Sequence, residues 1–169
     1  ILDRITDLQH RLGTAVLLIT HAMGVVYEAA DRVGVMYAGH MVEQASKEEL
    51  FRNPKHPYSV KLLESLPSRS RRGQDLATIP GRVPLPWEFP SGCRFADRCH
   101  KLMNGCKETL PVLKTVSNGA PVPHSVSCHL FDDTFKGEPI DLSGAQTEPV
   151  QLHTEKVNID PSVPLVELT

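Results

Sequence analysis

The chain has 169 residues, a formal net charge of −2 and 40% hydrophobic residues. This charge gives no electrostatic basis for binding nucleic acid or an anionic membrane surface, and no apolar run is long enough to span a bilayer. The sequence opens with neither a methionine nor a signal peptide, so we interpret it as a segment of a longer protein.

Residues 1–52 have the pattern of dense α/β structure. Apolar residues recur at helical spacing over residues 1–12, and Gly13 stands where a C-terminal cap is expected. Residues 15–19 (Ala-Val-Leu-Leu-Ile) form a continuous apolar run, which predicts a strand buried on both faces of a sheet.

The next elements are predicted to be short. A helical stripe over residues 23–30 precedes strands at 32–37 and 40–44, which a turn connects. Ser46 and Glu49 then form a capping box, in which the serine caps a new helix.

A further short helix is predicted to begin at Pro57, because proline suits the first helical position. Prolines are frequent over residues 68–90, which predicts a linker, and the arginines at 69–72 are interpreted as solvated. Residues 136–160 are low in aromatics and rich in small or charged residues, as in flexible linkers.

The position of His21 marks it as a candidate site residue. It directly follows the predicted buried strand, and ligands of parallel α/β sheets gather beyond the carboxyl ends of strands. An imidazole there can bond a terminal phosphate and orient an attacking water, although a histidine at a strand end is more often structural.

The cysteines are spaced C-x5-C-x6-C-x21-C, at Cys93, Cys99, Cys106 and Cys128. Nothing indicates secretion, so clustered cysteines point first to metal rather than to disulfides. Structural zinc sites commonly use a close pair such as C-x2-C, which is absent. Wide spacing suits a four-iron cluster, in which each iron takes one thiolate. Zinc and free or disulfide-bonded thiols remain the alternatives.

The cysteine segment has few large apolar residues and is not expected to fold on them alone. A bound metal would supply the missing stability, so a structural role is preferred to redox sensing. Arg94 and Arg98 are predicted to offset the charge of the thiolates beside them.

Three consecutive motifs carry a resemblance to a known family: Thr20–Val26, Ala30–Val33 and Val35–Gly39. In this order and spacing they resemble the end of an ABC-transporter ATPase domain, a P-loop NTPase of the α/β class, and the match covers residues 1–66. The resemblance implies that His21 is the H-loop histidine, which contacts the γ-phosphate of ATP.

One residue departs from the family pattern. Ala22 stands where the family usually has aspartate after the histidine. In the family that aspartate helps to position the loop, and this chain lacks it.

The element Asn53–Tyr58 narrows the resemblance. Its His-Pro-Tyr sequence is similar to the C-terminal extension of oligopeptide and dipeptide importers, where His56 and Tyr58 are interpreted as packing residues. The segments Gly92–Phe95 and Val126–His129 resemble the same importers. The resemblance implies a [4Fe–4S] cluster held by Cys93, Cys99, Cys106 and Cys128.

Two motifs of the ATPase site are missing from this sequence. No G-x-x-x-x-G-K-[ST] loop occurs, and no apolar strand ends in paired acidic residues. The family places both before the helix that opens this sequence. The intact protein is therefore expected to be a peptide-transporter ATPase that uses ATP with Mg²⁺, and this segment alone is expected to be inactive.

The resulting domain organisation has five parts. Residues 1–52 are the C-terminal part of the ATPase domain, and 53–90 hold the His-Pro-Tyr helix and the proline-rich linker. Residues 91–131 are the iron–sulfur extension and 132–163 a flexible linker. Residues 164–169 (Pro-Leu-Val-Glu-Leu-Thr) resemble the opening strand of a second ATPase domain on the same chain.

The resemblance also implies partners and a location. The partners are a second ATPase domain, transmembrane permease subunits and, indirectly, an extracytoplasmic solute-binding protein, with the subunit peripheral on the cytoplasmic face of the inner membrane. Two alternatives remain open: an importer of nickel or another small solute, and a zinc or iron–sulfur interaction module without an ATPase role. The sequence does not decide the cargo.

Overall fold

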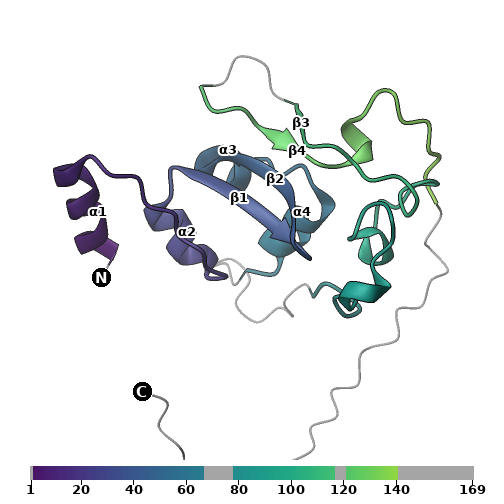
Figure 1. Ribbon diagram of the computed structural model, residues 1–169, viewed down its shortest axis with the longest axis horizontal. Helices are drawn as coiled ribbons and strands as arrows, with labels where there is room; N and C mark the ends of the chain where they lie inside the picture. Colours follow the sequence, from purple (N-terminus) through teal and green to yellow (C-terminus); the bar gives the residue numbers. More distant parts are fainter. Residues whose placement is uncertain (1, 67–77, 117–120, 141–169) are drawn as a thin grey trace, which may run out of the picture.

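The computed structural model describes residues 2–66, 78–116 and 121–140 (Figure 1). The arginine-rich stretch at 69–72, most of the polar linker predicted from residue 136 and the strand predicted at 164–169 lie outside these residues. None of the helices in the described part is long and apolar enough to cross a membrane.

An antiparallel sheet with the strand order β1-β2-β4-β3 lies at the centre of the structure. Strand β1 (Arg32–Tyr37) pairs with β2 (His40–Ser46) across a two-residue turn. Ala38 and Gly39 in this turn have φ values of 49° and 82°, and such left-handed pairs match the twist of a hairpin. The predicted hairpin is confirmed, with β2 extending two residues beyond the predicted end.

The other half of the sheet comes from the region of the cysteines. Strand β4 (Ser125–Val126) pairs with β2 on one side and with β3 (Lys114–Thr115) on the other, both antiparallel. Ser127 N–H continues this contact by donating to the carbonyl of Val42 at 2.8 Å. A backbone ladder thus joins the cysteine region to the hairpin.

Three short helices flank the hairpin: α2 (Met23–Ala29), α3 (Lys47–Arg52) and α4 (Pro57–Glu64). The predicted start of α3 is confirmed, because Ser46 Oγ accepts the N–H of Glu49 at 3.3 Å and caps the helix. Helix α4 begins at proline, as the sequence predicts.

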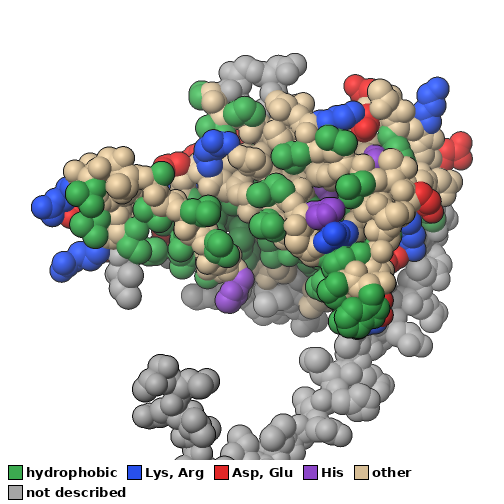
Figure 2. Space-filling model, in the orientation of Figure 1, with side chains coloured by type: hydrophobic (Ala, Val, Ile, Leu, Met, Phe, Trp, Pro, Cys, Tyr) green, Lys and Arg blue, Asp and Glu red, His purple; other side chains and the backbone are tan. Residues whose placement is uncertain are grey.

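The buried strand predicted at residues 15–19 is wrong. This segment has no regular secondary structure, and Leu17 and Ile19 are 89% and 90% exposed. A strand needs neighbours for its backbone N–H and C=O groups, and no strand of the described part lies beside this one. Helix α1 (Leu2–Leu12), which precedes it, likewise buries none of its residues. Figure 2 shows hydrophobic side chains open to solvent along this end of the molecule.

The core of the hairpin is closed by a side chain from the cysteine region. Phe95 is 1% exposed, and its ring centroid lies 5.1 Å from that of Tyr37 and 5.4 Å from that of Tyr58. Tyr37 and Tyr58 are themselves 4.8 Å apart. The three rings connect β1, α4 and the segment between the first two cysteines in one apolar cluster.

We expect Phe95→Ala to lower the free energy of unfolding by about 3–5 kcal/mol, because it removes a buried ring and leaves a cavity. Trp87→Ala is the matched control, since Trp87 is 79% exposed and its loss should change stability by about 0.5 kcal/mol or less. Urea denaturation of both variants measures the difference. Equal stabilities would contradict the placement of Phe95 in the core.

Candidate functional site

His21, the first predicted site residue, lies in a bend just before α2 and is exposed. The N–H of Ala22 donates to Thr20 Oγ1 at 3.0 Å, which closes a small turn around the histidine. His21 is not among the residues that line the pocket of the four cysteines. The two predicted sites are therefore separate.

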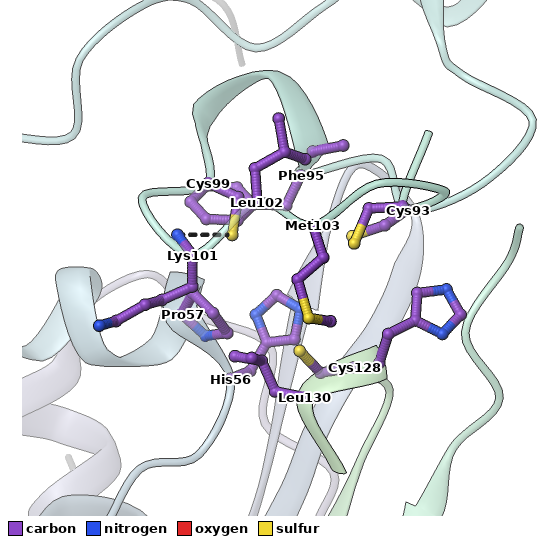
Figure 3. A pocket seen from close by; sticks show the side chains of 13 residues that line it. His56, Pro57, Cys93, Phe95, Cys99, Lys101, Leu102, Met103, Cys128 and Leu130 are labelled. Atoms are coloured by element: carbon purple, nitrogen blue, oxygen red, sulfur yellow. Dashed lines mark hydrogen bonds between the residues drawn. The ribbon is translucent and has the colours of Figure 1, made fainter. Parts of the chain in front are cut away.

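The four predicted cysteines do come together. Cys93, Cys99, Cys106 and Cys128 all line one pocket, whose cavity volume is about 20 Å³. Figure 3 shows Cys93, Cys99 and Cys128 around this space, with the side chain of Met103 in its middle. All four thiols are free.

Short turns and a backbone crossing place these cysteines. A 3-10 turn at Ala96–Arg98 separates Cys93 from Cys99. The N–H of Cys93 donates to the carbonyl of Cys106 at 2.8 Å, and Gly92 N–H donates to Lys107 at the same distance. A Cβ at position 92 would lie 2.4 Å from the Cys106 carbonyl oxygen, so only glycine permits this close approach.

Burial controls the protonation of the thiols. It raises the pKa of Cys99 to about 11 and that of Cys128 to about 12, and the neighbouring thiols add to both shifts. Burial likewise raises the pKa values of Cys93 and Cys106. The thiols are therefore protonated at neutral pH in the metal-free protein.

The two arginines predicted to offset the thiolate charge make hydrogen bonds to backbone carbonyls. Arg94 donates to the carbonyl of Ala38 and lies 4.5 Å over the ring of Phe89. Arg98 donates to the carbonyls of Pro80 and Ile79, each at 2.8 Å. Both guanidinium groups bind chain segments to one another, because backbone carbonyls lie within their reach.

The arrangement of the His, Cys, Asp and Glu side chains determines whether a site for a single metal ion is already formed. Within residues 2–66, 78–116 and 121–140, no group of three or more His, Cys, Asp or Glu side chains is placed to hold one metal ion. A zinc site needs its sulfurs about 2.3 Å from a common centre, and the thiols do not converge in that way. A four-iron cluster takes one thiolate at each iron, and four thiols line this pocket.

The sequence did not indicate a buried polar network beside this pocket. Glu43 in β2 is fully buried, and its Oε2 accepts the N–H of His56 at 2.9 Å. Its Oε1 accepts the N–H of Lys55 at 2.7 Å and lies 2.7 Å from Nε2 of His124. Because a buried carboxylate must be hydrogen-bonded, Glu43 fixes the start of α4 against β2 and β4.

Alkylation of Cys99 in the folded, metal-free protein by iodoacetamide at pH 8 should be about 100-fold slower than in the unfolded protein, because the thiolate reacts and burial suppresses it. Mass spectrometry of the peptide that carries Cys99 measures both rates, with urea-unfolded protein as the reference. Equal rates in the two states would contradict the raised pKa.

Comparison with known proteins agrees with the features described above. Residues 42–106, which hold most of β2, helices α3 and α4 and three of the cysteines, match the family described as "Oligopeptide/dipeptide transporter, C-terminal region". The chain is 48% identical over 129 residues to the "Probable peptide ABC transporter ATP-binding protein y4tR" of Sinorhizobium fredii, covering 76% of this chain and 37% of that protein. It is 44% identical over 133 residues to the "Oligopeptide transport ATP-binding protein AppD" of Bacillus subtilis, covering 79% of this chain and 39% of that protein.

These similarities confirm the resemblance drawn from the motifs. The chain belongs with the ATP-binding proteins of oligopeptide ABC transporters and corresponds to a part of one. It spans less than two fifths of the length of the two relatives described here.

Proposed function

We propose that this chain is part of the ATP-binding subunit of an importer that couples ATP hydrolysis to peptide uptake. The main support is the 48% identity to a peptide ABC transporter ATP-binding protein over three quarters of the chain. Because ATP-binding and acidic motifs are absent from the sequence, ATP with Mg²⁺ would be held mainly by other parts of the intact protein. The segment by itself would not hydrolyse ATP.

His21 is proposed as the residue that contacts the γ-phosphate. Its exposure in a bend leaves the ring free to meet a nucleotide bound by the rest of the ATPase site. Phosphoryl transfer to water depends on positioning and on charge stabilisation, and a neutral imidazole can accept a proton from the attacking water or donate to a phosphate oxygen.

Cys93, Cys99, Cys106 and Cys128 are proposed to hold a [4Fe–4S] cluster. Their position around one pocket supports a shared group, and four thiols match the four irons of such a cluster. The bound group would supply four iron–thiolate bonds that cross-link the turns of this small region. Phe95 already packs in the core of the hairpin. The stability gained from these bonds would therefore extend to the sheet.

The remaining assignments follow from the proposed role. Residues 1–52 would complete the ATPase domain, 91–131 would form the iron–sulfur extension, and residues 164–169 would open a second ATPase domain. Partners would be that domain, the transmembrane permease subunits and, indirectly, a solute-binding protein. The subunit would lie on the cytoplasmic face of the membrane.

Transport by the intact complex tests this proposal. The full-length protein, reconstituted with its permease subunits and solute-binding protein in vesicles, should accumulate labelled oligopeptide only when ATP is present. Accumulation of nickel but not peptide would show that the cargo is nickel rather than peptide. A complex that moves neither solute and hydrolyses no ATP would overturn the ATPase role.

A further inference from the structure

His56 is held more firmly than a packing residue requires. It is 1% exposed and caps the first turn of α4, where its Nδ1 accepts the N–H of Tyr58 at 3.0 Å. Its own N–H donates to the buried Glu43 carboxylate at 2.9 Å. These two hydrogen bonds fix both the backbone and the ring plane of the histidine.

The hydrogen bonds also determine which ring nitrogen carries the proton. Nδ1 of His56 accepts, so in the neutral ring the hydrogen is on Nε2. Nε2–H is therefore a fixed donor, yet it is buried and has no hydrogen-bond partner among the described residues. Buried donors without partners are rare, and one on a side chain that lines a pocket is available to a group bound in that pocket.

Nε2–H belongs to the His56 side chain, which is one of the side chains that line the four-cysteine pocket. His56 and all four cysteines share the lining of that pocket, and Figure 3 shows the His56 ring beside Cys128 and Met103. A second buried histidine, His129, also lines it, but its Nε2 lies 2.8 Å from the carbonyl of Thr109. In the neutral ring of His129 the one N–H donates to that carbonyl, so Nδ1 is an acceptor and offers no donor to the pocket.

We propose that Nε2–H of His56 donates a hydrogen bond to a sulfur of the iron–sulfur group in this pocket and thereby tunes its reduction potential. The inference rests on the proposed cluster. His56 acts as a positioning and tuning residue rather than as a ligand, since the four thiolates already complete the coordination.

The direction of the effect follows from charge. Adding an electron makes the sulfurs of the cluster more negative, so a fixed N–H donor stabilises the reduced form more than the oxidised form. Loss of the donor should therefore make reduction harder. Glu43 contributes indirectly, because its bond to the His56 N–H holds the ring in place.

His56→Asn in the full-length protein removes Nε2–H, because the shorter asparagine side chain ends before that position, while the asparagine oxygen can still cap α4. Spectroelectrochemical titration under anaerobic conditions should show about a tenfold smaller equilibrium constant for one-electron reduction, a shift of about 59 mV to more negative potential. Pulsed electron paramagnetic resonance of the reduced protein labelled with ¹⁵N-histidine should show a nitrogen coupling that this variant loses.

Ser59→Ala is the matched control. Ser59 lies on the same helix, and its hydroxyl is also buried without a partner but does not line the pocket. The reduction potential and the nitrogen coupling of Ser59→Ala should equal those of the wild type.

Iron and sulfide are measured first in every sample. A preparation with neither overturns the proposed cluster, whereas a full cluster whose potential and nitrogen coupling are the same in His56→Asn overturns the role of His56 alone.

Discussion

His21→Ala in the full-length protein is expected to lower ATP hydrolysis and peptide uptake by about 10²- to 10³-fold, the usual loss when one fixed polar group leaves a reacting centre. The imidazole would contact the γ-phosphate. Because His21 is exposed, the fold should be unchanged. Steady-state ATPase assays and vesicle uptake measure the effect.

His10→Ala is the control for this substitution. His10 is also exposed and lies in α1, outside the motifs that resemble the ATPase site. Both variants should keep the wild-type unfolding midpoint, and only His21→Ala should lose activity. Normal transport by His21→Ala would remove the assigned role, and an equal loss in both variants would show that the effect is not specific to the site.

Cys99→Ser is expected to abolish the visible absorbance of the cluster and to lower the unfolding temperature of the anaerobically purified protein. A serine hydroxyl is a poor replacement for a thiolate on iron, and metal-binding free energy contributes directly to folding in small metal-stapled regions. The loss should exceed that of an ordinary surface substitution, which is about 0.5 kcal/mol. Absorbance and calorimetry on the same samples give both quantities.

His100→Ala tests whether the neighbouring imidazole takes part. His100 adjoins Cys99 but is exposed, and it does not line the cysteine pocket. The variant should retain the full iron content and the wild-type unfolding temperature. Retention of the cluster by Cys99→Ser, or its loss in His100→Ala, would contradict the assignment of the ligands.

Local signals in the sequence predicted much of the hairpin and its helices. The turn at Ala38–Gly39, the cap at Ser46 and the proline at the start of α4 act through neighbouring residues, so their effects can be read from short segments. The gathering of the four cysteines was also predicted, although from motifs rather than from packing.

Features that depend on distant residues were not predictable in this way. An apolar run indicates a buried strand only if neighbouring strands cover it, and residues 15–19 have none in the described part. The role of Glu43 depends on His124, which reaches it through the pairing of β2 with β4. Arg94 and Arg98 bind carbonyls from earlier segments, which their proximity to the cysteines does not reveal.

Metal and sulfide analysis of the full-length protein, purified without oxygen, tests the central proposal most directly. The four-cysteine pocket predicts iron and acid-labile sulfide in about a 4:4 ratio per chain, since a [4Fe–4S] cluster takes one thiolate at each iron. One zinc per chain with no sulfide would contradict the cluster. Thiols that bind no metal at all would contradict it as well.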